Sequence, residues 1–228
     1  DNICHIRLLY CYPEVVTDAL IAEVRDNPKI VKYLDIPLQH SEDRILKLMG
    51  RRGTRAEYLA LLEKLRREIP QIALRTTFIA GFPTETEEEH EALKRFLQEA
   101  RFENCGFFAY SREEGTPAYR LRGQIPARVK ERRVRALYRV QEALSKERLS
   151  RFAGSTVRVL CDGIDYEKSC FFGHTAFQAY DADGKVYFNA SKAETGKYYD
   201  VLVERADEAD LYGHADTVSD KISAESEA

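Results

Sequence analysis

The sequence predicts an α/β fold with a parallel sheet, followed by a small all-β module, and two features support this. Strand-like apolar runs alternate with segments of helical periodicity over the first 110 residues, which is the pattern of βαβ units. Beyond Gly154, short β-rich runs are separated by turn-forming residues, as in small barrels and sandwiches. A long basic helix, expected from Pro126 to about Phe152, joins the two parts.

Four runs rich in β-forming residues are expected to be the parallel strands. They cover residues 6–12, 30–38, 72–82 and 105–110. Four βα units are too few to close an eight-stranded barrel. The sheet is therefore either open or part of a barrel that begins upstream of Asp1.

Capping residues mark the helices between these strands. Thr17, Ser41 and Thr86 are the expected N-caps, and Thr54 with Glu57 has the spacing of a capping box. Apolar residues recur at helical spacing after these caps and are expected to face the core. They are Leu20, Ile21 and Val24, then Ile45, Leu46 and Leu48, then Leu59, Leu62 and Leu65, then Leu93, Phe96 and Leu97, and in the long helix Val134, Leu137, Val140, Leu144 and Leu149.

The second part is expected to contain strands over residues 157–161, 186–189 and 199–205. Turns are expected at Asp162-Gly163 and Asp183-Gly184. The expected boundary between the two parts lies between residues 150 and 151, and the second part is expected to end at residue 216. Residues 217–228 are small and polar, which predicts a disordered tail.

The composition is typical of a globular protein of the cytoplasm. The 228 residues are 44% apolar and 32% charged, which suffices for a sizeable core. No run approaches the roughly 18 apolar residues of a membrane helix. The five cysteines are few, odd in number and widely spaced, which favours a reducing compartment. They are Cys4, Cys11, Cys105, Cys161 and Cys170.

The net charge of −3 is unevenly distributed along the chain. Residues 155–213 hold six Lys and Arg against eleven Asp and Glu, a net charge of −5. Residues 214–228 contribute a further −3, so residues 1–154 carry the remaining +5. A basic body is thus followed by an acidic module, which would repel nucleic-acid phosphates.

Turn-forming and polar residues gather where the predicted strands end. These ends lie at residues 12–14, 35–41, 80–85 and 110–116. In parallel α/β folds, ligands bind at the carboxyl ends of the strands, so a ligand site is expected there. Gly81 would let the backbone approach that ligand closely. Under the alternative interpretation, Pro and Gly only end the strands and the polar residues only cap helices.

Other kinds of site receive little support from the sequence. His40 is either a base or a structural residue beside the expected Ser41 cap. There is no P-loop, no G-x-G-x-x-G motif and no Ser–His–Asp order. The basic helix either binds RNA phosphates or is a solvated linker, and no aromatic stacking platform accompanies it.

Several motifs together resemble the radical S-adenosylmethionine (SAM) methylthiotransferase family. They are residues 41–55 (SEDRILKLMGRRGTR), 74–86 (LRTTFIAGFPTET) and 110–117 (YSREEGTP), and then residues 184–187 (GKVY) and 206–213 (ADEADLYG). The resemblance implies the carboxy-terminal part of a partial (βα)6 radical SAM barrel over residues 1–150. It also implies a small OB-like TRAM barrel over residues 151–216.

Three features resemble the branch of this family that modifies a ribosomal protein rather than tRNA. Residues 35–41 (DIPLQHS) stand where tRNA enzymes tend to have HLPVQSG, and residues 113–116 (EEGT) stand in place of their PRxGT. The acidic TRAM region is the third feature, because it suits a basic protein better than tRNA. The resemblance implies methylthiolation of the β-carbon of an aspartate on small-subunit ribosomal protein twelve.

The family uses SAM and two 4Fe–4S clusters, one of them held by a Cys-x3-Cys-x2-Cys motif. No such spacing occurs here, so the resemblance places the ligands of both clusters upstream of Asp1. It implies no metal ligand and no catalytic residue in this chain, which is expected to be inactive alone. SAM contacts are expected from the strand ends, at Gln39, Arg75, Gly81, Phe82, Pro83, Tyr110 and Ser111.

The implied partners are ribosomal protein twelve and the small ribosomal subunit, with no membrane, and nucleic acid is disfavoured as a partner. Two alternatives stay open at this point. One is a tRNA methylthiotransferase of the same family, and the other is an RNA-binding module without catalytic activity.

Overall fold

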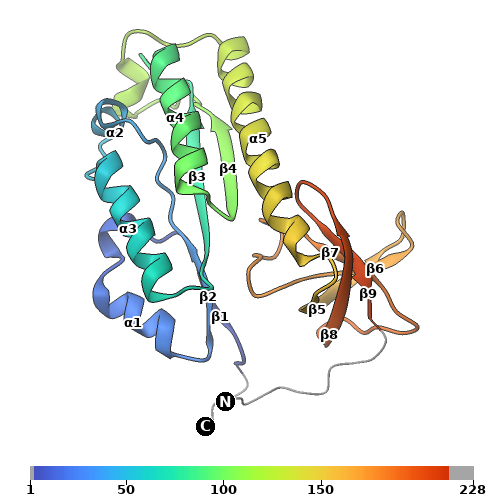
Figure 1. The fold of residues 1–228 in the computed structure, drawn as a ribbon. Helices are drawn as coiled ribbons and strands as arrows, with labels where there is room; N and C mark the ends of the chain where they lie inside the picture. Colours follow the sequence, from blue (N-terminus) through green and yellow to red (C-terminus); the bar gives the residue numbers. More distant parts are fainter. Residues whose placement is uncertain (1–2, 216–228) are drawn as a thin grey trace. The chain divides into compact units, whose positions relative to one another are not determined.

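The computed structural model describes residues 3–215, which divide into two compact units (Figure 1). The first ends at Leu144 and the second begins at Ser145. We refer to them as unit 1 and unit 2. The expected tail over residues 217–228 lies outside the described residues.

Unit 1 contains a four-stranded parallel sheet in the order β1-β2-β3-β4. The strands are β1 (Ile6–Leu8), β2 (Ile30–Asp35), β3 (Ala73–Ala80) and β4 (Asn104–Ala109). The four expected strands are confirmed, although the first three are shorter than expected. Pro37 cannot donate a backbone hydrogen bond, which helps to explain the early end of β2.

Five α-helices accompany this sheet. They are α1 (Asp18–Asp26), α2 (Asp43–Leu48), α3 (Arg55–Glu68), α4 (Glu87–Ala100) and α5 (Ala127–Leu149), with short 3-10 turns η1 (Pro13–Val15), η2 (Pro117–Arg120) and η3 (Ser150–Phe152). Thr17 caps α1, and Thr54 and Thr86 each form a complete capping box, as expected. The last turn of α5 belongs to unit 2.

The expected cap at Ser41 is wrong. Helix α2 begins after Glu42, and no side chain caps it. The hydroxyl of Ser41 instead donates to the Glu42 carboxylate at 3.1 Å, while His40 Nδ1 accepts from the Glu42 N–H at 3.1 Å. The hydroxyl of Ser41 and the imidazole of His40 thus both bind Glu42, the residue that precedes the helix.

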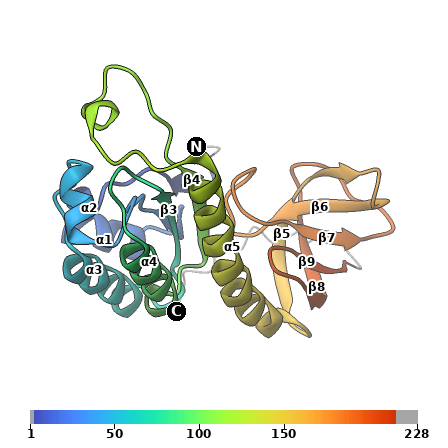
Figure 2. The same ribbon diagram turned by 90° about the horizontal axis from the view of Figure 1, so that it is seen from above.

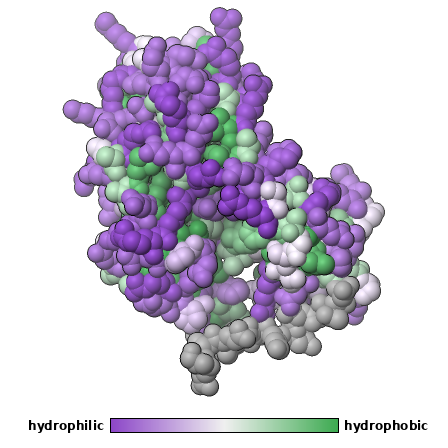
Figure 3. Space-filling view, viewed as in Figure 1, coloured by the Kyte–Doolittle hydropathy of each residue, from purple (hydrophilic) through white to green (hydrophobic). Residues whose placement is uncertain are grey.

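The helices of unit 1 pack on one face of the sheet. Most of the predicted apolar residues of α3, α4 and α5 belong to the core there, whereas Leu149, in the last turn of α5, packs in the core of unit 2. Those that are 2% exposed or less are Leu62, Leu65, Leu93, Phe96, Leu97 and Leu137. Phe78 of β3 lies among Phe96, Phe102 and Phe107, with ring centroids 6.0–6.1 Å apart. The outward surfaces of these helices are largely hydrophilic (Figure 3).

Unit 2 is a closed five-stranded barrel in the order β5-β6-β7-β9-β8. Its strands are β5 (Thr156–Asp165), β6 (Cys170–His174), β7 (Val186–Asn189), β8 (Tyr198–Ala206) and β9 (Leu211–His214). The three expected strands are confirmed, and two further strands, β6 and β9, complete the barrel. Its core contains Val159, Phe188, Val201, Val203 and Leu211, each at most 1% exposed.

The expected turn at Asp162-Gly163 is wrong, because both residues lie inside β5. The pairing register with β6 shifts between Cys161 and Gly163, which marks a bulge rather than a turn. The chain reverses later, where Ser169 has a φ of 52°. An Asp-Gly pair is compatible with both a turn and a bulge. Here the pairing of β5 with β6 determines that it forms a bulge.

We predict that Phe78→Ala destabilises the protein by about 3–5 kcal/mol, since it removes a fully buried ring from the centre of the unit 1 core. Urea unfolding followed by far-UV circular dichroism measures this loss. Phe108→Ala is the matched control, because Phe108 lies on the neighbouring strand but is 58% exposed. Equal losses in the two variants would contradict the assignment of the core.

Candidate functional site

The carboxyl ends of β2, β3 and β4 lie side by side in unit 1. Beyond β2, the C=O of Gln39 accepts from the N–H of Ile79 at 2.9 Å. Beyond β4, the N–H of Tyr110 donates to the C=O of Ala80 at 2.9 Å. The backbone therefore places Gln39 and Tyr110 on either side of the end of β3.

A pocket of about 500 Å³ opens at this edge of the sheet. Ile79, Phe82 and Tyr110 contribute apolar surface, and the Phe82 and Tyr110 rings meet edge to face with centroids 5.2 Å apart. Further walls come from residues 47–51 at the end of α2 and residues 116–118. The latter belong to the long excursion between β4 and α5 that Figure 2 shows in yellow-green.

Two polar atoms of this pocket are buried without a hydrogen-bond partner. They are Oε1 of Gln39 and the hydroxyl oxygen of Tyr110. Buried polar atoms in folded proteins are nearly always paired, so each such exception calls for an explanation. A ligand with polar groups on an otherwise apolar body would satisfy both atoms.

The expected site residues fall into two groups. Gln39, Phe82 and Tyr110 line the pocket. Arg75 lies earlier in β3 and forms an ion pair with Asp35 of β2, with Nη1 and Oδ1 3.1 Å apart. Ser111 is exposed and donates to Glu113 at 2.5 Å.

Gly81 and Pro83 belong to the turn that follows β3 rather than to the pocket wall. Gly81 has a φ of 76°, which L side chains rarely adopt. A Cβ at this position would collide with the side chain of Lys130 from α5. The close neighbour of Gly81 in this structure is therefore a helix, and the expected approach of a ligand to Gly81 stays a prediction.

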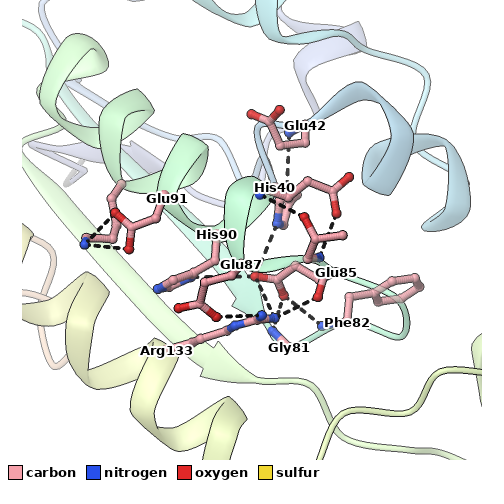
Figure 4. A network of polar contacts seen from close by, with 12 residues as sticks. His40, Glu42, Gly81, Phe82, Glu85, Glu87, His90, Glu91 and Arg133 are labelled. Atoms are coloured by element: carbon pink, nitrogen blue, oxygen red, sulfur yellow. Dashed lines mark hydrogen bonds and ion pairs between the residues drawn. The ribbon is translucent and has the colours of Figure 1, made fainter.

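A buried carboxylate closes this turn (Figure 4). Glu85 accepts hydrogen bonds from the backbone N–H groups of Gly81 and Phe82, the second at 3.1 Å. Arg133 of α5 lies 3.4 Å from Glu85 Oε1 and also donates to the backbone C=O of Glu85 at 3.0 Å. The side chain of Glu85 is fully buried and that of Arg133 is 5% exposed.

Two histidines face the same carboxylate from other elements. His40 Nε2 and His90 Nδ1 lie 4.0 and 3.6 Å from Glu85 Oε1. Burial raises the pKa of Glu85, but His40, His90 and the positive charge of Arg133 outweigh it and lower the pKa to about 2. Glu85 is therefore ionised at neutral pH, and it connects the ends of β2 and β3 to α4 and α5.

Sequence reasoning missed the roles of Glu85 and Arg133. Glu85 was noted only as one of the polar residues of the strand end over residues 80–85, and Arg133 only as one of the basic residues of the long helix. Only the apolar residues near Arg133 in the sequence could have marked it as inward-facing. Its neighbours along α5, Val134 and Leu137, were expected to face the core. For His40, the structure favours the structural interpretation, since both ring nitrogens lie inside this network.

The barrel of unit 2 presents a different surface. Tyr187 and Tyr212 stack with centroids 5.4 Å apart, and Lys168 and Arg205 lie 4.1 and 3.5 Å from the ring centres. They line a pocket of about 470 Å³. Burial, together with the hydrogen bond that Tyr212 donates to Asp207 at 2.8 Å, raises the pKa of Tyr212 to about 12. The sequence reasoning did not find this stack because β9 was not expected.

The described residues do not supply a site for an iron–sulfur cluster. Over residues 3–215, no three His, Cys, Asp or Glu side chains come together as metal ligands. Burial raises the pKa of the thiol of Cys11, which disfavours the thiolate that binds metals. In the same range, no helix is long and apolar enough to cross a membrane.

Comparison with known proteins identifies the family. A radical SAM superfamily model matches residues 2–97, and a TRAM domain model matches residues 153–215. Over 93% of its length the chain is 48% identical to the ribosomal protein uS12 methylthiotransferase RimO of Pelobacter propionicus. The chain belongs to the radical SAM methylthiotransferase family. It is also 44% identical, over 95% of its length, to the protein of the same name from Lachnoclostridium phytofermentans.

This chain spans about half the length of these relatives, 48% and 49% respectively. Among solved structures, coproporphyrinogen III oxidase (HemN) from Escherichia coli, a radical SAM enzyme, aligns with 87% of this chain and 46% of its own. The TM-score is 0.50 and the identity 13%, so the likeness concerns the fold alone.

The expected fold class, part of a radical SAM barrel followed by a TRAM barrel, is confirmed. Membership of the superfamily implies the use of SAM and 4Fe–4S chemistry.

We predict that the stabilising effect of the Glu85 carboxylate is lost in acid. The pKa is about 2 in the fold and 4.5 in the unfolded chain, so the stabilisation is complete above about pH 4.5 and falls as the pH drops towards 2. The shift corresponds to about 3 kcal/mol. Urea unfolding of the wild type and Glu85→Gln between pH 7 and pH 3 measures it. The difference in stability between the two should shrink as the pH falls; a constant difference would refute the assignment.

Proposed function

We propose that this chain forms the SAM-facing and substrate-facing part of an enzyme that methylthiolates the β-carbon of an aspartate on ribosomal protein uS12. The observation that carries the proposal is the 48% identity, over 93% of the chain, to a relative whose name states uS12 methylthiotransferase. Because the substrate is a ribosomal protein, the enzyme would act in the cytoplasm, on free uS12 or on the small subunit.

The pocket at the carboxyl ends of the strands is our proposed SAM site. Its volume of about 500 Å³ is in the range of small-molecule sites. Gln39 Oε1 would accept a hydrogen bond from SAM, the Tyr110 hydroxyl would donate or accept one, and Ile79 and Phe82 would pack against its apolar parts. When bound, SAM supplies radical chemistry at the substrate carbon and the methyl group.

The protein's contribution is to orient the substrate and SAM and to exclude water. Glu85 would hold the turn that carries Phe82, and the excursion over residues 111–124 would cover the pocket. Arg75, Gly81, Pro83 and Ser111 stay in the proposal as residues at or near the same strand ends, although they do not line the pocket itself.

The iron–sulfur clusters would be bound elsewhere in the full-length protein. Since the residues described here do not fit a cluster, we propose that both 4Fe–4S clusters are bound by residues upstream of Asp1. The chain without those residues would then be inactive.

The acidic TRAM region supports a protein substrate over tRNA. Its net charge of −5 over residues 155–213 would attract a basic ribosomal protein and repel tRNA phosphates. The two relatives named above also carry uS12 rather than tRNA in their names.

The decisive experiment gives the full-length enzyme, reconstituted anaerobically with iron and sulfide, SAM, a reductant and either uS12 or tRNA. We expect mass spectrometry to find one methylthio group in place of one hydrogen on a uS12 aspartate. uS12 with that aspartate changed to asparagine is the control and should stay unmodified. Modification of tRNA but not of uS12 would favour the tRNA alternative and defeat the proposal.

A second prediction concerns the two unpaired polar atoms of the pocket. Gln39→Leu and Tyr110→Phe should each weaken SAM binding by about 1–3 kcal/mol, because each removes a hydrogen bond to the ligand. Neither atom has a partner within the described chain, so the urea midpoint should not fall. Isothermal titration calorimetry with the full-length enzyme measures the affinity. Tyr138→Phe, outside the pocket, is the matched control and should bind SAM normally.

A further inference from the structure

One side of α5 is lined with arginines that the proposed reaction does not use. Arg128, Arg132, Arg135 and Arg139 recur at spacings of four, three and four residues, which places them on one face of the helix. All four are exposed, and Leu137 packs into the core from the opposite face. At 1.5 Å per residue, the row is about 16 Å long. We call these four residues the arginine row.

Few carboxylates neutralise the arginine row. Arg132 pairs with Glu87 at 3.0 Å, and this carboxylate is shared with Arg133. Arg135 pairs with Glu131 at 3.8 Å, but both side chains are more than 60% exposed, so this pair contributes little. Within residues 3–215, Arg128 and Arg139 have no carboxylate at ion-pair distance. Most of the positive charge therefore faces solvent uncompensated.

The row does not serve the stability of α5. Like charges three and four residues apart repel one another on a helix and destabilise it. Alternating signs would give a more stable solvated helix. Each of the four positions also carries arginine rather than lysine. The guanidinium group is planar, always charged and suited to binding phosphate through two hydrogen bonds at once.

We propose that the arginine row binds the phosphate backbone of RNA. Repeated positive charge along one helix face is complementary to the repeated negative charge of a nucleic-acid strand. The row itself contains no aromatic or amide side chain that could read bases, so the binding would not depend on sequence. This interaction goes beyond the proposed reaction and does not require it. It would bring the enzyme to a substrate protein that lies among RNA phosphates.

Salt-dependent binding of a fluorescein-labelled single-stranded RNA to the full-length protein tests this proposal. For single strands, the logarithm of the affinity falls with the logarithm of salt concentration by about 0.7 for each phosphate neutralised. Arg128→Gln/Arg139→Gln should therefore make the slope shallower by about 1.4. Arg128→Lys/Arg139→Lys, which keeps both charges, should restore most of it.

The matched control is Arg67→Gln/Arg95→Gln, which changes the net charge equally at exposed positions on α3 and α4. Its slope should equal that of the wild type. An unchanged slope in the row variant, or an equal change in the control, would overturn the proposal. Displacement of the RNA by polyglutamate at equal charge concentration would overturn it in favour of an acidic protein partner. Methylthiolation of uS12 is measured separately, so failure here leaves the proposed reaction standing.

Discussion

The geometry of the candidate site depends on the burial of one ionised carboxylate. Removing a carboxylate from water costs several kcal/mol unless fixed donors replace the water. At Glu85 the N–H groups of Gly81 and Phe82 donate to the carboxylate, and the guanidinium of Arg133 places a positive charge 3.4 Å from Oε1. The two N–H groups belong to the turn and the charge comes from α5, so all three act on the carboxylate together only when the turn has this conformation. The position of the Phe82 ring in the pocket wall follows from that conformation.

A second constraint is the one-sided packing of the sheet. Helices cover one face of the sheet (Figure 2). In β4, residues alternate between that face and the other. Phe108 of β4 is 58% exposed there, beside the ion pair of Arg75 and Asp35. All-parallel sheets are normally covered on both faces. A half-covered parallel sheet is what a portion of a (βα)6 barrel presents, because its inner face is shared with the remaining strands.

Local sequence signals predicted the elements well and their tertiary partners poorly. The capping boxes at Thr54 and Thr86 depend on side chains three residues apart, so the sequence contains everything that forms them. Ser41 failed as a cap because the helix begins one residue later, after Glu42, which only the folded chain reveals. The sequence locates the carboxyl ends of the strands, and this sufficed to predict three residues of the pocket: Gln39, Phe82 and Tyr110. The roles of Glu85 and Arg133 could not, because 48 residues separate the partners.

The two parts of the chain carry opposite charges, so a partner that binds both must itself carry positive and negative regions. The acidic region over residues 155–213 attracts positive charge and repels phosphates, whereas the arginine row of α5 attracts phosphates. Free tRNA is complementary in charge only to the arginine row, and a free basic protein is complementary only to the acidic region. A basic ribosomal protein that is still bound to RNA carries both charges. Such a ribonucleoprotein would satisfy both surfaces. Under the two proposals made above, uS12 on the small subunit would therefore bind better than the isolated protein.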